Sequence, residues 1–256
     1  MSVEIYQRFA QVLKHTSYSG RLMPYDWGQL PNQLDFTWAA YSMMFDEFAR
    51  ELANTINALT RHTHYLAAWR DLWPSLDEEA QIDAMVVFID PLATLALNLP
   101  YVIRSRFIFS SAHLCHQANR ARLGANWKDD FPLDKDVVKP TAATHGAAWR
   151  SFEEFMCRLN GVAGQEYGHG TRDFRHAYNH RISPRIVIGI SNLVTRTQHK
   201  TGGVTYGFGD TPALGLPLVV ALLEAQCQQA YLTFEAFQEL VREHEAAIVE
   251  HISAPR

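Results

Sequence analysis

The chain has 256 residues, of which 47% are hydrophobic and 20% are charged. This composition excludes an intrinsically disordered chain, which would carry fewer apolar and more charged residues. The formal net charge of −4 excludes a protein that binds nucleic acid through its overall charge.

The sequence lacks the features of a secreted or membrane-spanning protein. A signal peptide needs an uninterrupted apolar region, and Glu4 and Arg8 interrupt the apolar residues near the beginning of this sequence. The most apolar region, residues 84–99, is too short and too polar to cross a bilayer. The three cysteines are isolated and odd in number, which argues against structural disulfides and a cysteine zinc site. We therefore expect a soluble protein in the reducing cytoplasm, with no membrane partner.

Helical periodicity dominates the first half of the chain. Large apolar side chains at spacings of three and four predict a helix over residues 38–59 that runs on toward Trp69 or Trp73. These side chains are Trp38, Tyr41, Phe45, Phe48, Leu52, Ile56 and Leu59.

Three further helical segments are expected before residue 161. Pro74 breaks the first helix, and Ser75 with Glu78 resembles a capping box that starts a second helix, which ends at Pro91. The next helix is expected over residues 101–123. Residues 124–140 are polar, charged and bounded by prolines, which predicts a loop and an internal boundary. A helix over residues 141–160 and a glycine-rich link over residues 161–170 follow.

The pattern changes after residue 180. β-Branched and alternating apolar residues predict a β-hairpin near residues 185–209, with a turn at Thr201-Gly202-Gly203, and residues 214–251 are helical again. The expected fold is an all-α bundle with a small β-hairpin insertion before the last helix. Residues 1–123 form its N-terminal helical region, 124–140 a loop, and 141–256 a second helical region.

Charge is segregated along the chain. Residues 172–200 contain six basic residues and one acid, a local balance of +5, whereas the last helical stretch is acidic. A surface divided in this way can hold an anion at one place and repel it elsewhere. Ordinary solvated helix faces would give a similar distribution.

The densest group of polar residues is Thr171-Arg172-Asp173-Phe174-Arg175-His176-Ala177-Tyr178-Asn179-His180-Arg181. It resembles the signature of HEPN domains, in which an Arg is followed by a polar residue and then by a His after four to six residues. Arg175, His176 and His180 match that signature. The Arg–His pairs at Arg8 and Arg106 do not, because a phenylalanine follows each arginine.

The resemblance implies an all-α, metal-independent endoribonuclease that uses the 2′-hydroxyl of RNA and needs no cofactor. His180 would be the general acid or base and Arg175 would bind the phosphate. His176 and Asn179 would contact RNA, while Arg172 and Arg181 would make the electrostatic potential around the site more positive. DNA would be spared because it lacks the 2′-hydroxyl.

The resemblance also implies partners. Five positions on a regular helix separate Arg175 from His180 by about 140°, so the segment departs from regular helix or the cleft forms between two copies. The homodimer is expected by analogy with the family, which commonly assembles its cleft between two protomers, and not from the spacing itself. A role in toxin–antitoxin systems or antiphage defence is implied as well, with an antitoxin or regulatory protein as partner.

Two other interpretations remain open. His176 with His180, or His113 with His116, could share a helix face and bind a metal, but there is no HExxH motif, and structural roles fit His113 and His116 better. Alternatively, the chain is a non-catalytic helical module, a dimeric scaffold that binds a nucleotide or a partner, through the aromatic stripe or the acidic last helix.

Overall fold

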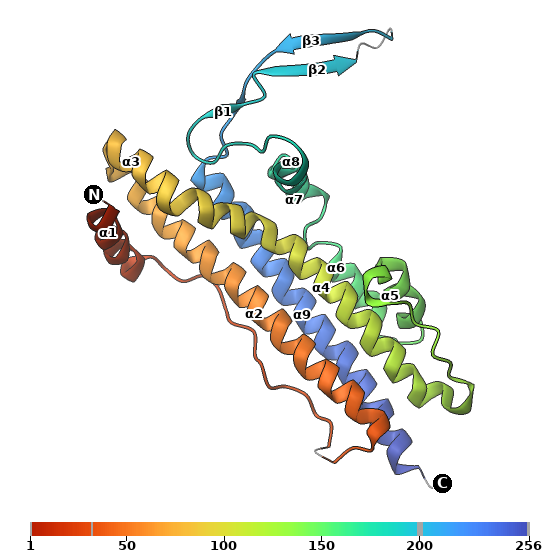
Figure 1. The fold of residues 1–256 in the computed structure, drawn as a ribbon. Coiled ribbons are helices and arrows are strands. Elements are labelled where there is room, and N and C mark those ends of the chain that lie inside the picture. The colour runs from red at the N-terminus through yellow and green to blue at the C-terminus, as the bar shows by residue number, and fades with distance from the viewer. Residues whose placement is uncertain (1, 32, 199–201, 255–256) are drawn as a thin grey trace. The chain divides into compact units, whose positions relative to one another are not determined.

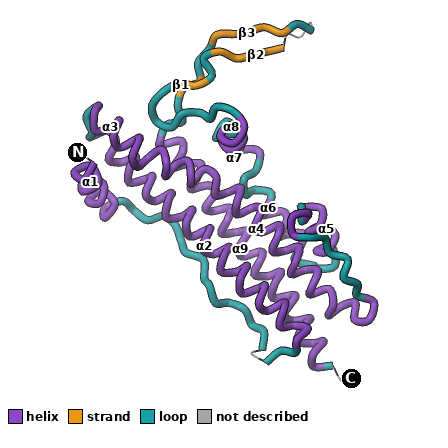
Figure 2. The backbone as a smooth tube through the Cα atoms, viewed as in Figure 1, coloured by secondary structure: helices purple, strands orange, loops and turns teal. Residues whose placement is uncertain are grey.

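The computed structural model describes residues 2–31, 33–198 and 202–254, which are mostly helical (Figures 1 and 2). The chain divides into two compact units: residues 1–20, 59–98 and 164–225 form the first, and residues 21–58, 99–163 and 226–256 form the second. Helices α2 (Phe36–Leu72), α4 (Asp90–Leu123) and α9 (Leu216–Ser253) contribute a segment to each unit. The predicted all-α fold with a small β insertion before the last helix is confirmed.

The first unit packs short helices against its segments of the long ones. The short helical elements are α1 (Ser2–His15), α3 (Glu78–Ala84), a π turn (Met85–Ile89), α7 (Gln165–Gly170) and α8 (Phe174–His180). Phe9 stacks on Trp69 with ring centroids 4.4 Å apart, and Trp69 stacks on Phe88 at 5.3 Å. The buried hydroxyl of Tyr167 donates a 2.9 Å hydrogen bond to the carbonyl of Leu97, which fastens α7 to α4.

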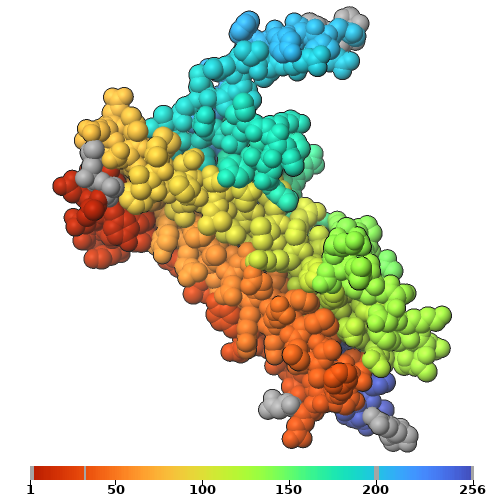
Figure 3. Space-filling view, viewed as in Figure 1, coloured from red at the N-terminus to blue at the C-terminus, as the bar shows by residue number. Residues whose placement is uncertain are grey.

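Two short antiparallel ribbons precede α9. Strand β1 (Ile190–Ser191) pairs with β4 (Thr211–Pro212), and β2 (Val194–Gln198) pairs with β3 (Val204–Phe208), so the expected hairpin is present. The hairpin extends beyond α7 and α8 of the same unit (Figure 3). Residue Thr201 of the predicted turn lies outside the described residues.

The second unit is built around an aromatic core. It contains α5 (Lys139–Gly146), α6 (Phe152–Leu159), its segments of the long helices and two 3-10 turns (Gly124–Asn126 and Asp134–Asp136). The rings of Phe107, Phe155 and Phe237 lie 5.6–5.8 Å from one another. Most of the aromatic stripe of α2 is buried here, including Trp38 and Tyr41, so the stripe is core and not a partner surface.

Several predicted helix boundaries were wrong. Asp77, not Ser75, caps α3, because its side chain accepts the N–H of Ala80 at 2.9 Å. Pro91 does not end a helix, and α4 is continuous from Asp90 to Leu123 with Pro100 inside it. The π turn directly before α4 already departs from the usual hydrogen-bond pattern, so the missing N–H of Pro91 disturbs the helix little.

The helix expected over residues 141–160 is two helices, α5 and α6. Gly146 ends α5, and a β-carbon there would lie 2.2 Å from the ring of Phe152. The carboxylate of Glu243 accepts the backbone N–H groups of Arg150 and Ser151 at 3.0 and 2.9 Å, which fixes the start of α6. The expected glycine-rich link over residues 161–170 also contains helix α7.

One helical stretch of the described residues, Glu78–Asn126, is long and apolar enough to cross a membrane by length and composition alone. One third of its most apolar window is buried inside the protein. A single stretch of this kind is a weak indication, because core helices meet the same criterion.

Candidate functional site

Helix α8 follows α7 through a tight left-handed turn. The N–H of Asp173 donates to the carbonyl of Gly168 at 2.7 Å, and the N–H of Arg172 donates to that of His169 at 3.0 Å, the two bonds of a Schellman motif. Arg172 and Asp173 have φ values of 54° and 53°. Buried Thr171 anchors the turn by donating its hydroxyl proton to the carbonyl of Tyr167 at 2.8 Å. The chain is thereby redirected so that α8 starts at Phe174.

Helix α8 is amphipathic over its two turns. Phe174 is buried, whereas Arg175, His176, Asn179 and His180 are exposed. At 100° per residue, these four side chains occupy the half of the helix opposite Phe174. The sequence-predicted group is therefore presented to solvent from one rigid element.

The exposed half of α8 has two adjacent columns. The side-chain amide of Asn179 donates to the carbonyl of Arg175 at 2.9 Å, which makes the first column. The rings of His176 and His180, one turn apart, have centroids separated by 5.1 Å and make the second. The structure thus brings Asn179 to Arg175 and His176 to His180.

Arg175 and His180 are not brought together on one line of the helix. Because α8 is helical through His180, the two side chains stay about 140° apart around its axis and flank the exposed half. The expected departure from regular helix begins only at Arg181, where φ is −147° and ψ is −147°.

The outer basic residues differ in their surroundings. A guanidinium nitrogen of Arg172 donates to the carbonyl of Pro212 and so joins the α7–α8 turn to strand β4. Arg181 is exposed directly after α8, and Arg185 is exposed further along the chain. Lys200, which also belongs to the predicted basic segment, lies outside the described residues.

Comparisons with protein-family models, with curated proteins and with solved structures find no match to this chain. Its function is therefore inferred from its own residues.

The second unit holds a polar group that sequence reasoning missed. His116, Asp130 and His145 each place one candidate ligand atom within 4.8 Å of the others, although 29 positions separate His116 from His145. Burial lowers the pKa of His145, the neighbouring His116 lowers it further, and Asp130 opposes both. From the sequence we expect a structural role for His116, and no role is predicted for His145.

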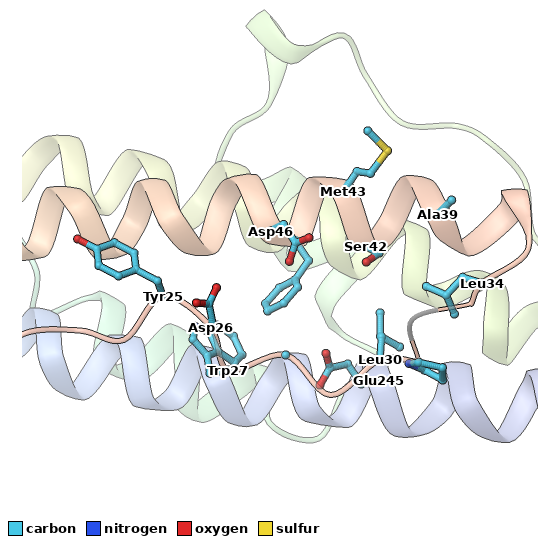
Figure 4. A pocket seen from close by; sticks show the side chains of 13 residues that line it. Tyr25, Asp26, Trp27, Leu30, Leu34, Ala39, Ser42, Met43, Asp46 and Glu245 are labelled. Carbon is cyan, nitrogen blue, oxygen red and sulfur yellow. The ribbon is translucent and has the colours of Figure 1, made fainter.

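A cavity of about 480 Å³ also lies in the second unit, lined by residues of α2, by Glu245 of α9, and by residues 25–28, Leu30, Pro31 and Leu34. The close-up in Figure 4 shows three carboxylates among its lining side chains, those of Asp26, Asp46 and Glu245. Burial raises the pKa of Glu245, while the N–H of Gln29, 2.9 Å from its carboxylate, acts in the opposite direction. An anionic lining of this kind disfavours phosphate, so the cavity does not suit RNA.

A buried histidine in the second unit is structural. Nδ1 of His244 lies 3.1 Å from the hydroxyl of Tyr41, and its Nε2 lies 3.6 Å from the sulfur of Cys115. Burial raises the pKa of the Cys115 thiol well above its ordinary value, which keeps the sulfur protonated. A protonated thiol without access to solvent is not a nucleophile.

Proposed function

We propose that the protein is a metal-independent endoribonuclease of the HEPN type, with its active site on α8. The observation that carries this proposal is the joint exposure of Arg175, His176, Asn179 and His180 opposite buried Phe174. The group lies in a segment with six basic residues and one acid. Such a face attracts a polyanion although the whole chain has a net charge of −4.

The proposed reaction uses the RNA's own 2′-hydroxyl. His180 takes the 2′-hydroxyl proton, the 2′-oxygen attacks the adjacent phosphorus, and the bond from phosphorus to the 5′-oxygen breaks. The leaving 5′-oxygen takes a proton from solvent, which leaves a 2′,3′-cyclic phosphate and a 5′-hydroxyl. Arg175 holds the phosphate and stabilises the charge that builds on its oxygens.

The active form we propose is a homodimer. Because Arg175 and His180 flank the exposed half of α8, a second copy of the helix facing the first would place an arginine of one chain near a histidine of the other. A two-fold axis through such a contact would create the same composite site twice. Arg172 and Arg181 would extend the positive field, and His176 and Asn179 would contact the RNA.

The cellular role that we propose follows the resemblance. A cytoplasmic ribonuclease of this type would act as a toxin or an antiphage effector and would need an antitoxin or another regulatory protein. Chelator-resistant RNA cleavage in cells that express the protein would be the first sign of such a role.

The test is cleavage by purified protein in the presence of a chelator. Wild type, Arg175→Ala and His180→Ala are incubated with one RNA and with DNA of the same sequence. We expect fragments with 2′,3′-cyclic phosphate ends from RNA alone, and a loss of at least about 100-fold for each variant, as is typical when an acid–base or charge-stabilising group is removed. Arg158→Ala and His15→Ala, exposed residues on α6 and α1, are the matched controls.

The outcome that contradicts the proposal is equally clear. If the wild type leaves RNA intact, or if both α8 variants cleave as fast as the controls, α8 is not an active site. The chain would then fit the alternative of a non-catalytic dimeric scaffold that binds a nucleotide or a protein partner.

A further inference from the structure

Three segments of the second unit meet at His116, which lies on α4 and is only 3% exposed. His145 comes from α5, and Asp130 comes from the loop between α4 and α5. In Figure 1 this loop and α5 lie beside the C-terminal part of α4. One oxygen or nitrogen atom from each of His116, Asp130 and His145 lies within 4.8 Å of the other two.

We propose that His116, Asp130 and His145 form a binding site for one Zn²⁺ ion. Two imidazoles and one carboxylate are a common zinc ligand set, and three protein ligands leave a fourth position for water. In a tetrahedral site with bonds of 2.0–2.1 Å, neighbouring ligand atoms are about 3.4 Å apart. Because the three atoms lie within 4.8 Å of one another, a contraction of at most about 1.4 Å would bring them onto the ion.

The site has the freedom to contract. Asp130 is exposed on a loop, so its carboxylate can move without disturbing packed side chains. His145 is half-buried near the end of α5, where a small change of its side-chain torsions is sufficient. Only His116 is fixed by burial, and it would serve as the anchor of the site.

The surroundings of His116 match those of a metal-binding histidine. Its Nε2 lies 3.2 Å from a carboxylate oxygen of Asp129. The Asp129 carboxylate would orient the imidazole ring or, after a small shift, partly neutralise the charge of the ion. The indole N–H of Trp127 donates to the backbone carbonyl of His116 at 3.1 Å. The side-chain amide of Asn119 donates to the carbonyl of His145 at 2.9 Å and so fixes α5 to α4.

Aromatic rings cover the histidines. The ring centroid of Phe131 lies 4.9 Å from that of His116 and 5.2 Å from that of His145. The ring centroid of Trp127 lies 5.1 Å from that of His116. These rings restrict water at the two imidazoles, which strengthens the attraction of a cation to nearby carboxylates.

One turn earlier on α4, the buried Nε2 of His113 makes no hydrogen bond to any described residue, although a carboxylate oxygen of Asp134 is 3.4 Å away. Besides the nitrogens of His116, this part of α4 therefore carries an imidazole nitrogen that no hydrogen bond from the described residues uses.

The ion would join the loop 127–133 and α5 to α4. It would thus stabilise a part of the second unit that consists of a loop and a helix of only two turns. Residues of α8 are not involved, so the site is independent of the proposed ribonuclease, and chelation is not expected to stop RNA cleavage.

The experiment is a titration of the full-length, chelator-treated protein with Zn²⁺ alone, in competition with a chromophoric chelator. We expect one equivalent to bind and the thermal midpoint to rise with its concentration. His145→Ala and Asp130→Asn should each weaken binding by at least about tenfold, because losing a ligand costs no less than losing an outer-shell partner. Asp130 is exposed, so its variant tests the site even if a histidine variant fails to fold.

Two controls decide the interpretation. Asp134→Asn changes a carboxylate of the same region that faces His113, and Arg175→Ala changes α8; both should bind Zn²⁺ as the wild type does. No saturable binding by the wild type, or equal binding by Asp130→Asn, His145→Ala and Asp134→Asn, would overturn the site. In that case, the contact between His116 and Asp129 is an ordinary hydrogen bond.

Discussion

The side-chain amide of Asn179 donates a 2.9 Å hydrogen bond to the backbone carbonyl of Arg175. This bond joins the last turn of α8 to its first turn and orients Asn179 alongside the proposed phosphate-binding arginine.

Substitution of Asn179 should therefore reduce RNA cleavage in a graded way. Asn179→Ala removes one hydrogen bond, worth about 0.5–1.5 kcal/mol, and we expect kcat/KM to fall by about two- to tenfold. Asn179→Asp should be more harmful, because a carboxylate repels both the Arg175 carbonyl and the RNA phosphate. Equal kcat/KM values for Asn179→Ala, Asn179→Asp and the wild type would show that this residue does not support the site.

Mixing two inactive variants tests the composite site. If Arg175 of one copy works with His180 of the other, a heterodimer of Arg175→Ala and His180→Ala has one site with both residues intact. Random exchange of subunits should then restore about a quarter of the wild-type activity, since half of the dimers are mixed and each has one working site. Each variant mixed with itself should stay inactive. No recovery after verified exchange would place both residues in one chain's site.

The β2–β3 hairpin gives a prediction about RNA binding that rests on the proposed function. Arg196 pairs with Tyr206 and Val194 with Phe208, so these four side chains share one face of the ribbon. Tyr206 is 67% exposed and Phe208 is 90% exposed. Exposed aromatic rings beside an arginine suit the stacking of unpaired bases.

We therefore expect Tyr206→Ala and Phe208→Ala each to weaken binding of single-stranded RNA by about five- to 100-fold, the range of a lost base stack. Binding is measured by fluorescence anisotropy at fixed salt. Thr205→Ala, on the opposite face of the ribbon, is the matched control. Because the aromatic side chains pack against little, the thermal midpoint should not change. Unaltered RNA affinity in both aromatic variants would exclude the hairpin from RNA binding.

Sequence reasoning succeeded where structure is set by local periodicity. The stripe from Trp38 to Leu59 predicted α2 because every third or fourth residue lies on the same helix face, and that face is buried. The polar group of α8 was visible because its four residues lie within six consecutive positions, 175–180. The exposure of this group could not be derived, since it depends on which side of α8 packs through Phe174.

Features that depend on distant partners could not be predicted. The break between α5 and α6 is fixed by Glu243, about 90 positions later in the chain. Asp130 and His145 approach His116 only because the loop after α4 folds back on that helix. Neither relationship leaves a periodic pattern in the sequence.

The buried His244 should make the stability of the protein depend on pH. Burial, with a smaller contribution from Arg122, lowers the pKa of His244 from 6.5 to about 3. In the unfolded chain this histidine binds a proton as the pH falls below 6.5, whereas the folded protein excludes that proton until about pH 3. Its contribution to stability is therefore present above pH 6.5 and is lost progressively between pH 6.5 and pH 3.

From pH 7 to pH 5 this single group should lower the free energy of unfolding by about 2 kcal/mol. Urea unfolding of the wild type and of His244→Gln at both pH values measures the difference. Glutamine keeps a hydrogen-bonding side chain near Tyr41 and Cys115 but cannot take up the proton, so the variant should lose about 2 kcal/mol less than the wild type over this interval. His15→Gln, an exposed position on α1, controls for a generic loss of histidine. Equal pH dependence in the wild type and His244→Gln would mean that water reaches His244 in the folded protein and lets it take up the proton there.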